Sequence, residues 1–195
     1  DAPAVAQRLV PDLPEGPLTA DKCWQAIANL APGGMILSEE AATSSIGLDV
    51  HMAGANAFDH MQTMGGSIGQ ALPAALGAAV AAPDRRVLCA TGDGGAMYTI
   101  QSLWTMAREN LNVVTVIFAN RSYAILNIEL MRVGAQNPGP KALDMLDIGR
   151  PDLNFTEIAQ GMGVEAGRVE TAEQFSTLLE QALSRKGPFV IKAVL

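Results

Sequence analysis

Two polar side chains at the ends of apolar runs are the residues of this chain that could bind a metal ion. Asp93 lies between two glycines after the run RVLCATG, and Asn120 ends the run VVTVIFAN, 27 residues further on. A helix expected at about 98–109 joins the two runs, and in such a βαβ unit the parallel strands end at one edge of the sheet. Asp and Asn oxygens suit Mg²⁺, and glycines let the backbone approach a phosphate. The pattern therefore predicts a metal and diphosphate site.

The Gly-Asp-Gly tripeptide alone is weak support, because it is common in turns. On that interpretation Asp93 is a turn former or helix cap, and Asn120 is an ordinary turn residue. A Rossmann dinucleotide site is the natural competitor, but GDGGAM lacks the third glycine of GxGxxG, and the P-loop sequence GxxxxGK(S/T) is missing from the chain. An aspartate beside a pyrophosphate also requires a cation between them. The metal interpretation is therefore favoured, and a Rossmann domain and a non-catalytic binding module remain alternatives.

Four other ionisable residues lie near predicted turns. Glu39 and Glu40 end the short run MILSEE, on the side of the sheet where ligands bind. One of them could face a pocket, but solvated turn carboxylates are the favoured interpretation. His51 and His60 flank a segment rich in Gly and Asn. They could carry protons, and surface or turn histidines are the favoured interpretation.

The elements that must position these residues alternate between strand and helix. Such alternation predicts an α/β fold, with a mostly parallel sheet and helices on both faces. Thr19 is expected to cap the first helix, and 131–153, rich in turn formers, is expected to be a lid or mobile loop. The strands are expected at 35–40, 86–93, 113–120, 164–169 and 188–194, and the helices at 20–31, 68–82, 98–109, 155–162 and 172–185.

The composition narrows the class of protein. Half of the residues are hydrophobic (49%) and the net charge is −7, which argues against a nucleic-acid partner. Because no run reaches 18 apolar residues, we expect no membrane partner and a cytoplasmic location. Cys23 and Cys89 are isolated and are expected to be buried thiols rather than zinc or redox ligands. Four prolines in 1–18 predict a linker or leader, with one domain at 19–195.

The run from Ile68 to Leu126, IGQALPAALGAAVAAPDRRVLCATGDGGAMYTIQSLWTMARENLNVVTVIFANRSYAIL, resembles the C-terminal diphosphate-binding domain of thiamine-diphosphate (ThDP) enzymes. Within that family, the chain resembles most the acetolactate synthase large subunit and benzoylformate decarboxylase. The resemblance extends from about Thr19 to the C-terminus.

This resemblance implies a role for particular residues. Mg²⁺ would be held by Asp93, the Asn120 side chain and the Ser122 carbonyl. Ile68 would force the cofactor into a bent shape, in which it removes its own proton, and the Gly66 carbonyl would accept a hydrogen bond from its 4'-amino group. The remaining residues expected at the cofactor are Thr43, Ser44, Gly92, Gly94, Gly95, Tyr98, Tyr123 and Leu126.

Three departures from the family pattern are visible. Ala119 stands where many relatives have a first Asn, and Gly95 replaces a common Ser, which removes one hydroxyl from the diphosphate contacts. The segment 65–70, GGSIGQ, is unlike either near relative and assigns no substrate.

The resemblance also implies parts beyond this chain. Relatives carry an N-terminal pyrimidine-binding domain with an activating glutamate and a middle domain that can hold FAD, so no catalytic residue is expected here. We expect the C-terminal third of a longer enzyme or a separate subunit, in a homodimer or homotetramer, inactive by itself. The implied reaction is decarboxylation or carboligation of 2-keto acids, and the sequence does not decide between acetolactate synthase-like and benzoylformate decarboxylase-like outcomes.

Overall fold

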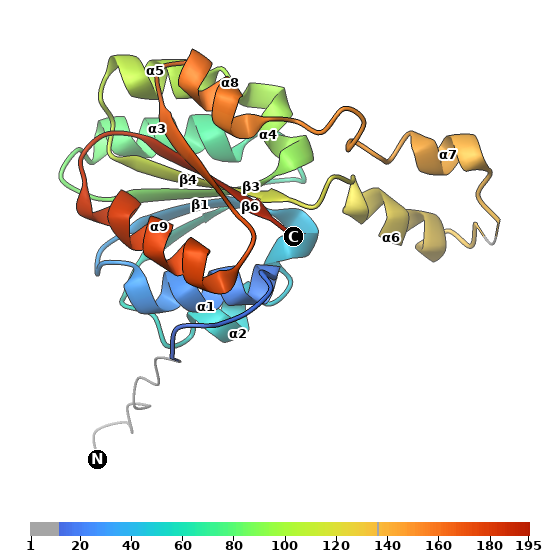
Figure 1. Ribbon diagram of the computed structural model, residues 1–195, viewed down its shortest axis with the longest axis horizontal. Helices are drawn as coiled ribbons and strands as arrows, with labels where there is room; N and C mark the ends of the chain where they lie inside the picture. The colour runs from blue at the N-terminus through green and yellow to red at the C-terminus, as the bar shows by residue number, and fades with distance from the viewer. Residues whose placement is uncertain (1–11, 136) are drawn as a thin grey trace.

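A computed structural model describes residues 12–135 and 137–195, and its described strands form one parallel sheet between two layers of helices (Figure 1). The order across the sheet is β2-β1-β3-β4-β6-β5, with every neighbouring pair parallel. This confirms the predicted α/β class. The strands are β1 (Ile36–Glu40), β2 (Asp59–Gln62), β3 (Val87–Gly92), β4 (Val113–Ala119), β5 (Glu165–Val169) and β6 (Phe189–Val194).

The central strands are apolar because helices cover both faces of the sheet. β4 is buried over its whole length, and β3 and β6 are buried except at their last residue. Successive side chains point to opposite faces, so Leu88 and Val116 enter one hydrophobic cluster while Cys89 and Ile117 enter the other. Both cysteines are buried, as predicted, and burial raises the pKa of each thiol.

The two helical layers in Figure 1 correspond to these two clusters. The predicted cap is confirmed, since the Thr19 side chain accepts a hydrogen bond from the Lys22 amide at the start of α1. One layer contains α1 (Ala20–Leu30), α2 (Leu48–Met52) and α9 (Ala172–Ser184), and the other contains α3 (Ala71–Ala81), α4 (Asp93–Thr99), α5 (Ser102–Arg108) and α8 (Phe155–Gly161).

The sequence-based element assignment was wrong in two places. The helix expected at 98–109 is two helices, and the first, α4, already begins at Asp93. The edge strand β2 was not predicted, because DHMQ is exposed along its length and has no apolar alternation.

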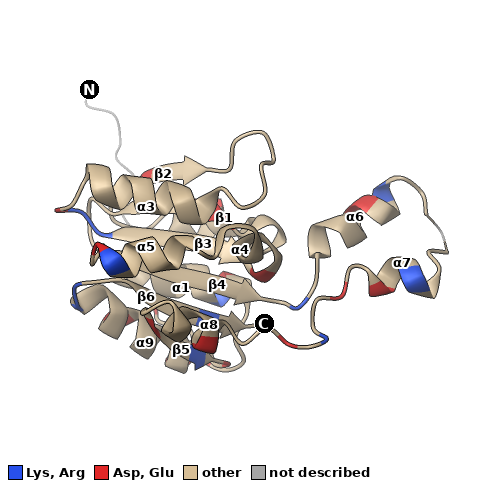
Figure 2. Ribbon diagram, turned by 90° about the horizontal axis from the view of Figure 1, so that it is seen from above, with Lys and Arg blue, Asp and Glu red and all other residues tan. Residues whose placement is uncertain are grey.

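Residues 124–135 and 137–146 belong to an arm that projects beyond the carboxyl end of β4. It contains α6 (Ala124–Arg132), which was not predicted, and α7 (Pro140–Asp144), which lies within the expected loop 131–153. Both views show the arm pointing away from the sheet (Figures 1 and 2). Neither helix has a buried residue, so the core imposes no helical period that the sequence could reveal.

The described part of the predicted leader lies against the domain. The Leu18 amide donates to the Glu170 carbonyl at 3.1 Å, and the Gly16 amide donates to the Glu173 carboxylate at 2.6 Å. Residues 1–11 of that segment lie outside the described residues. In the part of the chain that the structure describes, no helix has the length and apolar character to cross a membrane.

Candidate functional site

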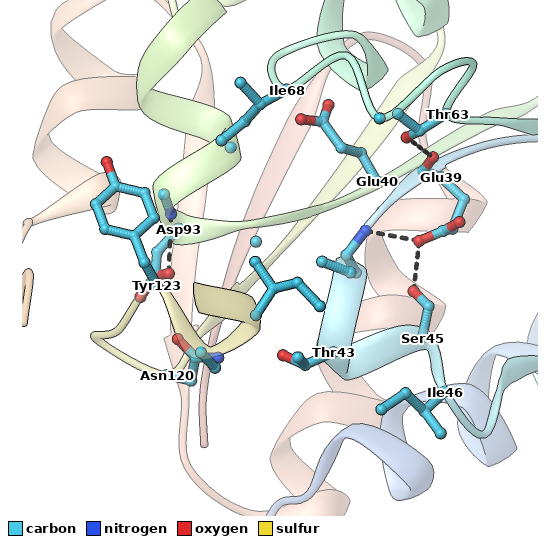
Figure 3. A pocket seen from close by; sticks show the side chains of 18 of the residues that line it. Glu39, Glu40, Thr43, Ser45, Ile46, Thr63, Ile68, Asp93, Asn120 and Tyr123 are labelled. Atoms are coloured by element: carbon cyan, nitrogen blue, oxygen red, sulfur yellow. Dashed lines mark hydrogen bonds between the residues drawn. The ribbon is translucent and has the colours of Figure 1, made fainter. Parts of the chain in front are cut away.

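A cavity of about 460 Å³ lies at the carboxyl edge of the sheet (Figure 3). After β1 the chain turns to β2 on one side, whereas after β3 it continues to β4 on the other, so β1 and β3 flank a topological switch point. Open α/β sheets bind ligands there. The lining residues come from the last residues of β1, β2 and β3 and from the segments that follow β1 to β4: Glu39, Glu40, Ala41, Ala42, Thr43, Ser45, Ile46, Gln62, Thr63, Gly66, Ile68, Gly92, Asp93, Gly94, Gly95, Asn120, Ser122, Tyr123, Ala124 and Ile125.

Asp93 joins the ends of two strands at this cavity. Its side chain is 3% exposed and accepts hydrogen bonds from the Gly94 amide at 2.9 Å and the Arg121 amide at 2.6 Å. Burial raises the pKa of Asp93, and these amides partly offset the rise. Arg121 has a φ of +57°, a conformation that costs a non-glycine residue about 1 kcal/mol or more. The hydrogen bond to Asp93 helps to hold that strained turn.

Asn120 and Ser122 lie beside Asp93 because their strands are neighbours in register. Gly92 pairs with Phe118 across β3 and β4, so both following turns reach the same cavity. The Asn120 Oδ1 atom accepts from the Ser122 amide at 3.0 Å, which fixes the carboxamide in the turn. The three predicted metal ligands are thus brought together.

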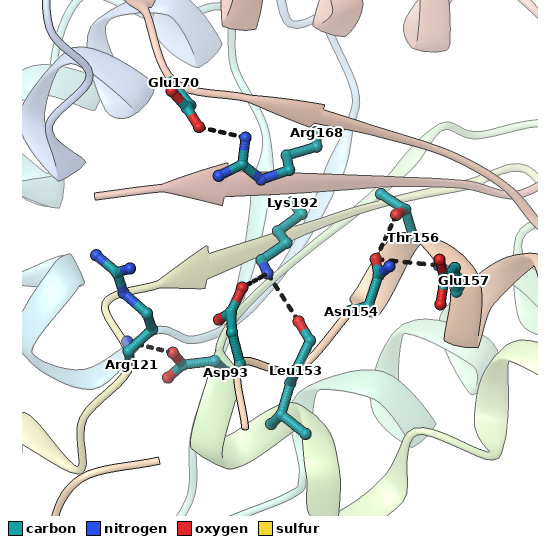
Figure 4. Close-up of polar contacts among 10 residues, drawn as sticks. Asp93, Arg121, Leu153, Asn154, Thr156, Glu157, Arg168, Glu170 and Lys192 are labelled. Atoms are coloured by element: carbon teal, nitrogen blue, oxygen red, sulfur yellow. Dashed lines mark hydrogen bonds and ion pairs between the residues drawn. The ribbon is translucent and has the colours of Figure 1, made fainter. Parts of the chain in front are cut away.

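The charges around Asp93 suit a bound cation. The lining residues include no Lys, Arg or His within the described chain. Lys192 acts on Asp93 only at a distance, because its ammonium is hydrogen-bonded to Asp152 at 2.9 Å and to the Leu153 carbonyl at 2.7 Å (Figure 4). A buried carboxylate without an ion pair is costly unless a cation neutralises it. The residues present therefore fit Mg²⁺, with one carboxylate, one amide and backbone oxygen.

No cluster of three or more His, Cys, Asp or Glu side chains among the described residues could hold a metal on its own. A metal at Asp93 would accordingly need oxygens from a ligand to complete its shell. Magnesium is commonly bound in this way, by one or two carboxylates together with phosphate oxygens and water.

The glycines at the cavity differ in what surrounds them. A Cβ on Gly92 would meet nothing within 4 Å, so the backbone is open to a ligand there. A Cβ on Gly94 would lie 2.4 Å from Cε1 of Tyr123, so this glycine is needed for the tyrosine to pack over the turn. The backbone is thus accessible to a ligand at Gly92 and covered by the Tyr123 ring at Gly94.

Ile68 lines the cavity from the loop between β2 and α3 (Figure 3). Its side chain is 46% exposed although it is large and apolar. Gly66 lines the same wall, and its φ of +68° is readily adopted only by glycine. The loop therefore presents an apolar side chain and a backbone turn to the space beside Asp93.

Three of the predicted cofactor residues lie outside the lining. Ser44 is buried behind the wall, where its carbonyl accepts from the Trp24 indole at 2.7 Å. Tyr98 is exposed near the end of α4 beside Gly69, and Leu126 is exposed on α6. Thr43, which was predicted together with Ser44, does line the cavity, and Ile125, which was not predicted, lines it beside Leu126.

Glu39 and Glu40 are not solvated turn carboxylates, and that interpretation was wrong. Both are buried and both line the cavity. Glu39 accepts from the Ala41 amide at 2.6 Å and from the Ser45 hydroxyl at 2.5 Å. Their place at the carboxyl end of a strand was visible in the sequence, whereas their buried hydrogen-bond partners were not.

The two histidines do not line the cavity. His51 lies on α2, with its Nε2 3.4 Å from the Asp21 carboxylate. His60 lies on the edge strand β2, with its Nε2 4.0 Å from Glu39. Neither is placed for proton transfer within the cavity.

The Lys192–Asp152 pair fixes the chain where it returns from the arm. Replacing Asp152 with Ala leaves the buried Lys192 ammonium with the Leu153 carbonyl as its remaining hydrogen-bond partner among the described residues. We expect the free energy of unfolding to fall by about 1–2 kcal/mol in urea titration, less than for a fully buried pair because Asp152 is half-exposed.

Two further measurements check that interpretation. The hydrogen bond from Lys192 lowers the pKa of Asp152. The ion pair therefore stabilises the fold above the ordinary Asp pKa of about 4, and this stabilisation is lost as the pH falls through the lowered pKa. The difference in the free energy of unfolding between wild type and Asp152→Ala should therefore shrink in acid. A Lys192→Met change should recover stability in the Asp152→Ala background, and a further loss would contradict the pairing.

Comparison with known proteins identifies one family. Residues 47–193 match the family model described as thiamine pyrophosphate enzyme, C-terminal TPP binding domain. A Mycobacterium tuberculosis (strain ATCC 25618 / H37Rv) protein provisionally named acetolactate synthase large subunit IlvX is 52% identical over 185 residues, covering 94% of this chain and 36% of that protein. An alpha-keto-acid decarboxylase of Mycobacterium bovis (strain BCG / Pasteur 1173P2) is 34% identical over 91% of this chain and 30% of its own length.

Solved structures give the same result. The thiamine diphosphate-dependent 4-hydroxybenzoylformate decarboxylase of Rhodococcus jostii RHA1 superposes with a TM-score of 0.79 at 30% identity, covering 90% of this chain and 32% of that one. Benzoylformate decarboxylase from Polynucleobacter necessarius gives 0.78 at 25% identity, over 97% and 35%. The chain thus spans about a third of the length of these relatives.

Proposed function

The chain belongs to the thiamine pyrophosphate (ThDP) enzyme family and contains its C-terminal TPP-binding domain, and on that premise we propose that it supplies the diphosphate and Mg²⁺ half of a 2-keto acid active site. The reaction we favour is acetolactate synthase-like decarboxylation and carboligation. A benzoylformate decarboxylase-like lyase is the second candidate, favoured by the structural relatives.

The observation that carries this proposal is the buried carboxylate of Asp93, which lacks an ion pair among the described residues and shares a cavity with Asn120 and Ser122. We assign the three metal ligands to the Asp93 carboxylate, the Asn120 amide oxygen and the Ser122 carbonyl. Because the lining contains no cationic side chain in the described chain, the diphosphate would be attracted through the metal and held by backbone and hydroxyl groups.

The remaining wall residues would orient the cofactor and exclude water. Bound ThDP supplies the carbon nucleophile and the electron sink for decarboxylation. Ile68 would support the bend of the cofactor, and Gly66 would offer its carbonyl. Gly92 would allow close approach of the diphosphate, and Thr43 would reach it from the turn after β1.

The proposed site is completed by groups outside the described residues. A 2-keto acid carries a carboxylate, and no described Lys or Arg lines the cavity to receive it. We therefore propose that residues 19–195 form a C-terminal domain that works with an N-terminal pyrimidine-binding domain of the same or another chain, in a homodimer or homotetramer. That partner domain would also bring the activating glutamate, and FAD would belong to a middle domain.

A ligand screen tests the cofactor assignment. We expect millimolar ThDP with Mg²⁺ to raise the melting temperature of the chain, and neither component alone to do so, since binding stabilises by RT ln(1 + [L]/Kd) even when it is weak. NAD and flavin nucleotides serve as controls. If NAD raised the melting temperature equally with and without Mg²⁺, the result would instead support a Rossmann nucleotide-binding domain.

Turnover separates the remaining possibilities. The 195-residue chain alone is expected to decarboxylate no pyruvate, and measurable turnover would contradict the division of the site between two domains. In the assembled enzyme, products from pyruvate and from benzoylformate distinguish carboligation from aldehyde release. A complex with neither activity that still binds ThDP would be a non-catalytic binding module.

A further inference from the structure

Glu40 is a buried carboxylate at the cavity that the proposed chemistry does not use. It ends β1 and is 9% exposed. One oxygen accepts a short hydrogen bond from the Gly69 amide, and the other accepts from the Ala71 amide at 2.6 Å. No cationic side chain pairs with it among the described residues, so these two amides are what hold the charge in place.

The contacts of Glu40 fix the loop that leads into α3. Gln70, the residue just before α3, does not cap the helix with its side chain. Instead Glu40, at the end of β1, accepts a hydrogen bond from the first backbone amide of the helix, that of Ala71. From the other side, the Gly69 carbonyl accepts from the Thr99 hydroxyl at 2.8 Å. The loop that carries Ile68 is therefore held between β1 and α4.

Glu40 also fills space beside α4. A Cβ on Gly95 would lie 2.9 Å from the Glu40 Oε1 atom and 3.1 Å from the Thr91 hydroxyl. The carboxylate cannot easily move away, because both of its oxygens are bound to backbone amides. Any side chain at Gly95 would consequently displace Glu40 and, with it, the loop containing Gly66 and Ile68.

We propose that Glu40 is a positioning residue of the cofactor site, which holds loop 65–70 in place and requires glycine at Gly95. Its role toward the cofactor rests on the proposed function, because it acts through Gly66 and Ile68. Its role toward the loop and toward Gly95 rests on the contacts alone. The absence of a hydroxyl at Gly95 is, in this account, the steric consequence of a glutamate on the adjacent strand.

A double-mutant cycle on the full chain tests the steric part. Within a helix Gly→Ala is ordinarily stabilising, and Gly77→Ala in α3, where a Cβ meets nothing within 4 Å, provides the matched control. Gly95→Ala should instead lower the melting temperature by roughly 3–10 °C. In the Glu40→Ala background the same change should be neutral or stabilising, so the sign reverses.

Hydrogen exchange tests the positioning part in an isosteric variant. Glu40→Gln replaces one acceptor by an NH₂ group, so at least one of the Gly69 and Ala71 amides should exchange about 10- to 100-fold faster. Glu39→Gln, the neighbouring carboxylate that binds other groups, should leave them unchanged. The proposal would be overturned if the changes in melting temperature of Gly95→Ala and Glu40→Ala were additive, or if amide exchange were unchanged in Glu40→Gln. If Glu40→Ala does not fold, the comparison of Gly95→Ala with Gly77→Ala decides the steric part.

A cofactor titration separates this inference from the proposed function. With ThDP and Mg²⁺ we expect Glu40→Gln to bind roughly tenfold more weakly than wild type, because the loop is less ordered. If wild type itself shows no metal-dependent binding, the proposed function fails, while exchange and the cycle still decide the role of Glu40. If wild type binds and Glu40→Gln binds equally well, the positioning role toward the cofactor fails alone.

Discussion

Asp93→Ala is expected to weaken Mg²⁺-dependent ThDP binding by roughly 100-fold or more, because it removes the one carboxylate at the proposed metal position. The unliganded chain should be little affected. Removing the buried charge relieves a desolvation cost, whereas the Gly94 and Arg121 amides lose their acceptor, and these effects oppose each other within about 1 kcal/mol. Isothermal titration and thermal melting of the same sample measure both quantities.

Two variants control for this result. Asp84→Ala removes an exposed carboxylate from a turn away from the cavity and should change neither binding nor stability. Asp93→Asn keeps an acceptor for one amide but lacks the charge, so it should resemble wild type in stability and Asp93→Ala in binding. Binding that survives in Asp93→Ala, or that is lost only together with the fold, would count against a metal at this position.

Ile68→Ala should reduce turnover of the assembled enzyme by roughly 100-fold, because a cofactor displaced by about 1 Å loses its reactive alignment. Its effect on stability should stay under about 1 kcal/mol, since the side chain is 46% exposed in the cavity rather than packed in the core. Steady-state kinetics and urea unfolding of the same variants compare the two effects.

Ile68→Leu and Ile68→Met are the matched controls, because both keep a bulky apolar side chain. We expect each to retain turnover within a few-fold of wild type. If Ile68→Ala were as active as the leucine variant, or if its loss of activity followed its loss of stability, Ile68 would be an ordinary wall residue.

Much of the fold could be predicted because burial on both faces leaves a clear pattern. The strands that end just before Asp93 and Asn120 are mostly apolar runs, and their parallel arrangement follows from the helices between them. The convergence of these two residues on one cavity was a consequence of that topology. The edge strand β2 and the arm helices α6 and α7 have no buried residues, so no core pattern revealed them.

The part of the site that escaped prediction depends on tertiary contacts. Glu39 and Glu40 look like surface residues in the sequence, and only the return of the chain at Gly69 and Ala71 places amides around Glu40. Similarly, the resemblance placed Tyr98, Tyr123 and Leu126 near a cofactor. Of these only Tyr123 lines the described cavity, together with Ile125, which was not predicted. Spacing along the chain locates strand ends and does not give the direction of side chains on the helices that follow.

The most direct test is the position of a metal. Crystals of the chain soaked with Mn²⁺ and millimolar ThDP should give an anomalous peak within about 2.2 Å of an Asp93 carboxylate oxygen, the Asn120 amide oxygen and the Ser122 carbonyl oxygen. Diphosphate density should adjoin that peak. A peak at another place, or ThDP bound with Asp93 and Asn120 contacting no metal, would contradict the account.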